Sequence, residues 1–226
     1  MNGIGIFMFI LFAVIIIAAV IYGAIAARKR REELAALAAR LGLTFRADND
    51  HSLADRLGFL NALAQGSNRY AFNLLAGVYE GHEVLVFDYH YETHSSGSKG
   101  QRQTHHHYFS FFVLTLPRSF PELRITREGL LSKIAQAFGY DDVDFESAEF
   151  SRAFCVRSKD KKFAYDFCNA QMMEYLLANR DLSIEVERTA LALAFASRLS
   201  AAEIESNLQR LFAIRSRLPE YLFTKV

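Results

Sequence analysis

Residues 4–31 read IGIFMFILFAVIIIAAVIYGAIAARKRR, and this stretch decides how the chain is built. Its first 24 residues carry no charged side chain. An α-helix rises about 1.5 Å per residue, so such a run reaches ~36 Å and can cross a hydrocarbon core ~30 Å thick. Four basic residues follow at once: Arg28, Lys29, Arg30 and Arg31. The sequence therefore predicts a single transmembrane anchor over residues 1–27.

The basic cluster predicts the orientation of this anchor. Lys and Arg beside a membrane helix are retained on the cytoplasmic side, where they also meet anionic head groups. We therefore expect the N-terminus outside, the C-terminal domain in the cytoplasm, and the lipid bilayer as the first partner. An inverted topology, which would export the domain, is the alternative orientation.

A cleaved signal peptide is the alternative to an anchor, because Ala24-Ile25-Ala26 matches the small residues before a cleavage site. The apolar run is much longer than a signal core of ~7–15 residues, and no basic residue precedes it. Both features favour the uncleaved anchor.

Small residues also recur every four positions within it, at Ala19, Gly23 and Ala27. Such a stripe lets two helices approach closely and predicts a homodimer, unless these residues are simply common in membrane helices.

Charges nearly cancel over the 226 residues, with 26 Lys and Arg against 25 Asp and Glu. A nucleic-acid partner would need a clustered excess of cations, so none is expected.

The two cysteines, Cys155 and Cys168, lack the spacing of a metal or redox motif and are expected to be buried thiols. About 200 residues remain beyond the anchor, enough for one sizeable domain or two small ones.

The helix is expected to continue as a juxtamembrane stalk over residues 28–42. One face of the stalk is apolar, through Leu34, Leu37, Ala38 and Leu41. This face could pack on the domain or on a partner stalk. Gly42 suits a C-terminal cap. A cytoplasmic α+β domain over residues 43–226 would follow, beginning with a short strand at 43–45 and a short helix capped by Ser52.

Residues 70–93 show the clearest β pattern. Two strand-like runs, 70–79 and 82–93, meet at Glu80-Gly81, which is typical of a tight hairpin. Within the second run the odd-numbered residues from Leu85 to Tyr91 are all apolar. Because side chains alternate along a strand, one face of this strand is expected to be wholly apolar.

The other elements follow from turn residues and helical spacing. They are strands at 104–116, 123–126 and 153–157, helices at 129–138 and 170–178, a hairpin of 183–187 with 191–195, and a final helix to about 217. Pro117 is expected to end the third strand. Ser200 and Glu203 form a capping box for the last helix, and Pro219 stops it. The mixture predicts an α+β fold, an antiparallel sheet with helices packed on it.

Two stretches carry a resemblance to a known family. They are the hairpin 77–89 (GVYEGHEVLVFDY) and residues 146–157 (ESAEFSRAFCVR), followed by Asp160, Phe163-Ala164 and residues 172–177 (MMEYLL). Over residues 40–222 the chain resembles bacterial single-pass membrane proteins with a domain of unknown function. The resemblance implies a bacterial protein of the inner (plasma) membrane. It implies no activity and no catalytic residue.

The most unusual local feature is Thr104-His105-His106-His107-Tyr108. If residue 90 pairs near residue 106, then His90, Glu92 and His94 share one strand face, and His106 faces them. Imidazole and carboxylate groups are ligands of zinc, copper and nickel, and a site needs three or four of them. A metal site is therefore one interpretation. The alternatives are an ordinary polar edge strand and a pH-sensitive surface.

No motif in the sequence predicts catalysis. G-x-S-x-G, H-E-x-x-H, a P-loop and a dinucleotide fingerprint are all missing. No catalytic residue and no cofactor is therefore assigned. The leading hypothesis is a non-enzymatic, membrane-tethered module that binds or scaffolds another membrane or cytoplasmic protein. A metal sensor or metal-dependent enzyme using the 90–107 histidines is the second hypothesis, and a lipid-surface binder using the basic cluster is the third.

Overall fold

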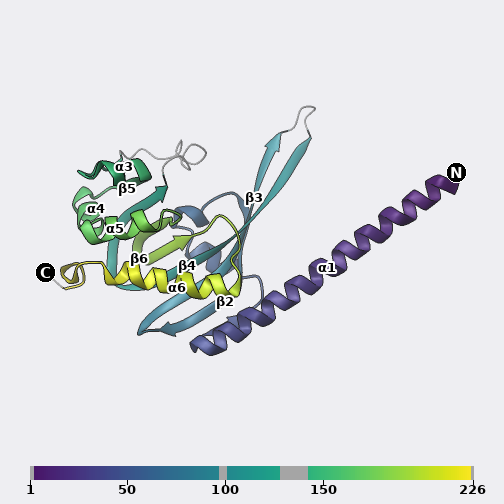
Figure 1. The fold of residues 1–226 in the computed structure, drawn as a ribbon, viewed down its shortest axis with the longest axis horizontal. Helices are drawn as coiled ribbons and strands as arrows, with labels where there is room; N and C mark the ends of the chain where they lie inside the picture. The colour runs from purple at the N-terminus through teal and green to yellow at the C-terminus, as the bar shows by residue number, and fades with distance from the viewer. Residues whose placement is uncertain (1–2, 97–100, 128–141, 225–226) are drawn as a thin grey trace.

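The computed structural model describes residues 3–96, 101–127 and 142–224. The chain forms one long N-terminal helix followed by an antiparallel sheet with helices packed on it (Figure 1). The predicted α+β fold with an N-terminal apolar helix is therefore confirmed. The helix expected at 129–138 lies outside the described residues.

Helix α1 spans Gly3–Leu41 and runs without a break from the apolar segment through the basic cluster. Its N-terminal half stands clear of the domain (Figure 1), and the apolar window is wholly unburied. Within the described residues it is the one helix long and apolar enough to cross a membrane, as in a single-pass protein.

The helix ends as expected at Gly42, which has a φ of +71°. The N–H groups of Gly42 and Leu43 donate to the carbonyls of Ala39 and Ala38, at 3.3 and 2.8 Å. These two bonds form the Schellman pattern, which satisfies the last carbonyls of the helix.

The last turns of α1 belong to the folded domain. Leu34, Leu37 and Ala38 are buried in its larger core. Arg40 adds a two-pronged ion pair with Glu205 of helix α6 (Ala201–Ser216). The apolar face of residues 28–42 therefore packs on the domain, which is one of the two alternatives that its sequence left open.

In the described part of the chain, six strands form one sheet: β1 (Thr44–Arg46), β2 (Ser67–Tyr79), β3 (His82–Ser96), β4 (Arg102–Arg127), β5 (Phe154–Ser158) and β6 (Ile184–Ala194). Their order is β1-β2-β3-β4-β5. Strands β3 and β5 pair with one edge of β4, at different positions along it, and β6 pairs with its opposite edge. The predicted β2–β3 hairpin is confirmed. Glu80 and Gly81 both have positive φ, +48° and +79°, which a tight turn matching the strand twist requires.

Strand β4 corrects the expectation that Pro117 ends the third strand. The strand continues from Arg102 to Arg127 and so includes the expected fourth strand. Its pairing with β3 stops at Leu114, and its pairing with β5 starts at Leu123. Pro117 lies in this gap, opposite a register shift in β6. A proline is tolerated there because no ladder hydrogen bond is lost.

Strand β6 corrects the expected hairpin of 183–187 with 191–195. Both halves pair with β4 as one strand, through register shifts near Phe120, and Arg188 has a φ of +54°. Ile184 and Val186 face the larger core, and so do Leu191 and Leu193. Even-numbered residues therefore face this core before Arg188, and odd-numbered residues face it afterwards. A bulge therefore reverses the phase of the alternation, which a sequence pattern cannot distinguish from a turn.

The remaining elements are α2 (His51–Arg56), η1 (Asn61–Leu63), α3 (Ala148–Ala153), α4 (Lys161–Phe167), α5 (Ala170–Ala178) and η4 (Glu220–Leu222). The predicted helix 170–178 and the capping box of α6 are confirmed. The N-cap of α2 is Asp50 and not Ser52, because the Asp50 carboxylate reaches the Leu53 N–H at 2.8 Å. Helix α4, with Asp160 as its N-cap, lies between β5 and α5, where the sequence predicted no helix.

Each face of the sheet packs against its own hydrophobic core, because successive side chains along a strand point to opposite faces. Val84 and Val86 join the larger core, with α1 and helices α3 to α6. Phe87 and Tyr89 join a smaller core under α2 and η1. The wholly apolar face expected for β3 is therefore the one turned to the smaller core.

A buried polar network joins α1 to the sheet. Asp88 of β3 is 1% exposed, and the Arg30 guanidinium donates to both of its oxygens at 2.8 and 2.9 Å. Asn73 and Ser110 donate to the same carboxylate at 2.9 and 2.8 Å. Arg30 also donates to the carbonyl of Leu199, just before α6. Four segments of the chain thus meet at one carboxylate, and Arg30 links a fifth to them.

Removing Arg30 is expected to destabilise the domain strongly, because it leaves the buried Asp88 charge without a counter-ion. Arg30→Met should lower the free energy of unfolding of the full chain in detergent by about 3–5 kcal/mol. Arg31→Met, at the exposed neighbouring position, should change it by less than about 0.5 kcal/mol. In the double variant Arg30→Met/Asp88→Asn the loss should be smaller than the sum of the single losses. Urea titrations of these variants and of Asp88→Asn measure the losses, and equal losses for Arg30→Met and Arg31→Met would contradict the role of the network.

Candidate functional site

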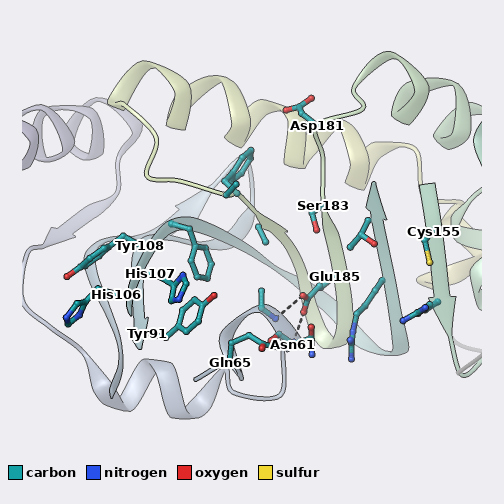
Figure 2. A pocket seen from close by; sticks show the side chains of 18 residues that line it. Asn61, Gln65, Tyr91, His106, His107, Tyr108, Cys155, Asp181, Ser183 and Glu185 are labelled. Carbon is teal, nitrogen blue, oxygen red and sulfur yellow. Dashed lines mark hydrogen bonds between the residues drawn. The ribbon is translucent and has the colours of Figure 1, made fainter. Parts of the chain in front are cut away.

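A cavity of about 670 Å³ lies beside η1, against the strands from β3 to β6. Tyr91 and Phe109 give it an aromatic wall at one end. Polar and charged groups from Arg124, Glu185 and Arg157 line the other end. Figure 2 shows Tyr91 and His107 on one side of Glu185, and Cys155 on the other. The cavity therefore suits a ligand with an apolar part and a polar part.

Glu185 is the most unusual group in the cavity wall. Its side chain is buried, and its two oxygens accept the backbone N–H groups of Asn61 and Ala62 at 2.7 and 3.0 Å (Figure 2). Burial raises the pKa of this carboxyl, and Arg124, its partner across β4, partly opposes the shift. Glu185 thus caps the start of η1 and fixes this segment on the sheet.

The outer charges of the cavity are held in ion pairs. Arg157 donates to Asp142 at 2.7 Å, and this bond lowers the pKa of the Asp142 carboxyl. Arg210 donates to both oxygens of Asp181, at 2.6 and 2.7 Å. Such paired charges favour a binding or structural role for this end of the cavity.

The histidine cluster predicted from the sequence lies on the face of β3 opposite to Tyr91, and His106 of this cluster also lines the cavity (Figure 2). His90 and Glu92 on β3 and His106 on β4 present one ligand atom each, and these three atoms lie within 4.8 Å of one another. His90 Nε2 lies 3.1 Å from His106 Nδ1, and His106 Nδ1 lies 3.5 Å from a Glu92 oxygen. The structure therefore brings together three of the four residues expected to form a metal site.

His94, the fourth expected residue, lies beyond the cluster. Its ring nitrogens contact Ser67 at 3.2 Å and Thr104 at 3.1 Å. The strand register explains this position. Glu92, and not residue 90, is the direct partner of His106, so the expected pairing is off by two residues and His90 lies diagonally opposite.

His90 is held in a defined setting. It is 1% exposed, and its ring stacks on Tyr70 with 4.5 Å between centroids. Its Nδ1 lies 3.0 Å from the Asn68 carbonyl oxygen, which can only accept, so Nδ1 carries the hydrogen. Burial lowers the pKa of His90, which favours the neutral ring.

Asn68 also positions Glu92. Its side-chain amide donates to a Glu92 oxygen at 2.6 Å, and this bond lowers the pKa of the Glu92 carboxyl. Asn68 lies in a bulge of β2 with a φ of +48°. One residue in a left-handed conformation therefore holds two of the three ligand candidates, one through its backbone and one through its side chain.

The basic cluster has two different surroundings. Arg28 and Lys29 pair with Glu32 and Glu33 one turn along the helix, at 2.9 and 3.9 Å, and Arg31 is exposed. Arg30 instead turns into the domain to bind Asp88. It therefore has a structural partner that its place in the basic cluster did not predict.

The small-residue stripe Ala19, Gly23 and Ala27 is exposed on α1. No heavy atom lies within 4 Å of a Cβ built on Gly23. The face is thus open to a neighbouring helix, and the homodimer stays a prediction.

Sequence reasoning missed three residues that organise these sites: Asp88, Asn68 and Glu185. Asp88 gave a usable signal, since a lone carboxylate inside the run VLVFDY must be buried and paired. Glu185 looked like an ordinary exposed residue of an alternating strand. Asn68 gave no signal, because its role comes from a bulge.

The raised pKa of Glu185 predicts the direction in which stability changes with pH. Its contribution to stability is fully present below the ordinary value of 4.5 and is lost as the pH rises through the raised value. We therefore expect the wild type to gain stability relative to Glu185→Gln as the pH falls from about 7 to about 4.5.

Glu203 of the α6 capping box is the matched control. Its hydrogen bonds to Ser200 lower its pKa, so its contribution is present above the ordinary value and is lost as the pH falls through the lowered one. The stability of the wild type relative to Glu203→Gln should therefore decrease towards low pH. Urea titrations from about pH 7 to well below pH 4.5 test both signs, because the Glu185 change lies above the ordinary value and the Glu203 change lies below it. The same sign for both variants would contradict the assignment for Glu185.

No family model matches the chain, and none of the curated proteins compared with it is similar. Among solved structures, the chain is similar to the crystal structure of the mycobacterial trehalose monomycolate transport factor A, TtfA, with a TM-score of 0.62. The match covers 85% of this chain and 97% of that chain at 14% sequence identity. At this identity the likeness shows a shared fold alone. The neighbour is bacterial, and the resemblance to a family of single-pass membrane proteins of unknown function stays a prediction.

Proposed function

We propose that the protein is a membrane-anchored accessory module, whose domain binds or scaffolds another protein at the cytoplasmic face of a bacterial inner membrane. One observation carries this proposal: a single unbroken helix contains the membrane-type segment and ends in the core of the domain. Helix α1 continues from its apolar part into the core, and Arg30 binds the buried carboxylate of Asp88. The domain is thus held in one orientation relative to its anchor.

A fixed orientation suits a scaffold better than a tethered enzyme that captures diffusing substrates. Presenting a surface already oriented reduces the entropy that a partner loses on binding. A flexible linker would give up this advantage, and residues 28–42 contain no Gly-rich or Pro-rich segment before Gly42. The continuous helix therefore favours a partner that is itself fixed in the membrane or close to its surface.

The charge pattern supports the proposed side of the membrane. Arg28, Lys29 and Arg31 surround the end of the apolar segment, and cations at this position are retained in the cytoplasm. They would also contact anionic head groups, so the lipid surface is part of the proposed binding environment.

The structural neighbour is named as a transport factor, and the shared fold covers nearly all of that chain. An accessory role beside a membrane-embedded protein is compatible with that name. Self-association through Ala19, Gly23 and Ala27 is the alternative use of the same anchor.

Fusions at the C-terminus test the proposed topology. A fluorescent protein that folds only in the cytoplasm should be bright after Val226, and alkaline phosphatase at the same place should be inactive. The reason is that the cations after residue 27 keep the domain inside. A dark fluorescent fusion together with an active phosphatase fusion would overturn this orientation.

A linker insertion tests whether the fixed orientation matters. Gly-Ser-Gly-Ser placed between Ala27 and Arg28 keeps the Arg30–Asp88 pair but uncouples the domain from the anchor. Ala-Ala-Ala-Ala at the same place keeps a continuous helix, with a turn of about 40° and a rise of about 6 Å.

The readout is photo-crosslinking in cells from the exposed position Val78. The product with a second membrane protein should fall several-fold for the flexible insertion and persist for the helical one. Equal crosslinking for both insertions, or no product from this and other exposed positions, would contradict the accessory role.

A further inference from the structure

We propose that His90, Glu92 and His106 bind one divalent transition-metal ion of the zinc class, with a fourth coordination position open to water. This inference goes beyond the accessory role and does not depend on it. It rests on the spacing of three ligand atoms, on the tautomer of His90 and on the hydrogen bonds that hold the ligands.

The spacing of the three ligand atoms fits a tetrahedral ion. Zinc binds imidazole nitrogen and carboxylate oxygen at about 2.0–2.2 Å, which places neighbouring ligand atoms roughly 3.3–3.5 Å apart. The His90–His106 and His106–Glu92 distances are 3.1 and 3.5 Å, and all three atoms lie within 4.8 Å. Small side-chain rotations would bring all three into range, while the backbone of the β3–β4 ladder stays fixed.

The tautomer of His90 leaves the correct nitrogen free. Its Nδ1–H donates to the Asn68 carbonyl, so the lone pair of Nε2 points towards His106. Metal-bound histidines commonly donate their second ring N–H to a carbonyl or carboxylate in this way. Here the contact already exists and belongs to a buried ring, so it needs no rearrangement.

A proton now lies where the ion would bind. His90 Nε2 can only accept, so the hydrogen between the two rings is carried by His106 Nδ1. When a metal binds, the neutral His106 ring changes tautomer: Nδ1 gives up its hydrogen, Nε2 takes one up from solvent, and the Nδ1 lone pair faces the ion. The His106 side chain is 53% exposed, so an ion can reach the site without opening the core.

The donor set selects the class of ion. Two imidazole nitrogens and one carboxylate suit Zn²⁺, Cu²⁺ or Ni²⁺, whereas Mg²⁺ and Ca²⁺ prefer oxygen ligands alone. Glu92 supplies the negative charge, and the Asn68 amide fixes its position. Tyr70 on β2 and Tyr108 on β4 flank the His90 ring from the two neighbouring strands, with ring centroids 4.5 and 4.7 Å from that of His90.

The test uses the full chain, purified in detergent with an affinity tag that contains no histidine. Zn²⁺ binding is measured by competition with a chromophoric chelator and by elemental analysis after dialysis. One ion per chain is expected for the wild type. His106→Ala and Glu92→Gln should weaken binding at least 10-fold. Asn68→Gly, which keeps the positive φ but removes the amide, should weaken it roughly 10-fold through Glu92.

His105→Ala is the matched control. His105 neighbours His106 on the same strand but points to the opposite face, where it contacts Ser95 at 2.9 Å. Its loss should leave the affinity unchanged. The thermal midpoint should rise with Zn²⁺ in the wild type and in His105→Ala, but not in His106→Ala, which also shows that the variants are folded.

Three results would overturn the proposal. The first is a folded wild type that binds no Zn²⁺ at about 10 μM free ion. The second is equal weakening by His105→Ala and His106→Ala, which would mean that binding is an unspecific property of the histidine-rich strand. The third is stoichiometric binding that Glu92→Gln and His106→Ala both leave unchanged, which would place the ion elsewhere.

Discussion

The rest of the structure depends on the ion pair between Arg30 and Asp88. A carboxylate that is 1% exposed is tolerated only because Arg30, Asn73 and Ser110 surround it with donors. Each donor comes from a different element, so the pair fixes α1 against three strands at once. Asn73 reaches it from a β2 bulge with a φ of +51°. The strain of that conformation is offset by the bond that it allows.

The same strand face carries both the ion pair and the histidine cluster. Asp88, His90 and Glu92 alternate along β3, and together they turn a stretch of sheet surface into a polar seam. Two bulges in β2 place hydrogen-bond donors against these residues: Asn73 donates to Asp88, and Asn68 donates to Glu92. Polar groups on one face thus set the local backbone of the neighbouring strand, while Phe87, Tyr89 and Tyr91 on the other face build the smaller core and the cavity wall.

Periodicity and capping carried most of the fold prediction. The apolar run, the alternation from Leu85 to Tyr91, the Glu80-Gly81 turn and the Ser200–Glu203 capping box are local signals, and the structure contains each element that they indicate. The errors lie where tertiary pairing overrides a local rule. Pro117 is tolerated inside β4 because neither neighbouring strand pairs with it, and Arg188 reverses the phase of β6 without a turn. The histidine cluster was predicted by residue type, whereas its register and the role of Asn68 depend on a bulge that no local pattern encodes.

The continuity of α1 has a consequence for how the protein responds to its membrane. In the proposed arrangement an apolar helix of ~36 Å lies in a hydrocarbon core of ~30 Å, and a tilt of the helix would relieve the mismatch. Because Arg30 and the buried leucines fix the domain on the same helix, the domain must tilt with it. A thicker bilayer would set the helix upright and raise the domain with it. In this arrangement the angle between the domain and the bilayer plane would therefore change with bilayer thickness.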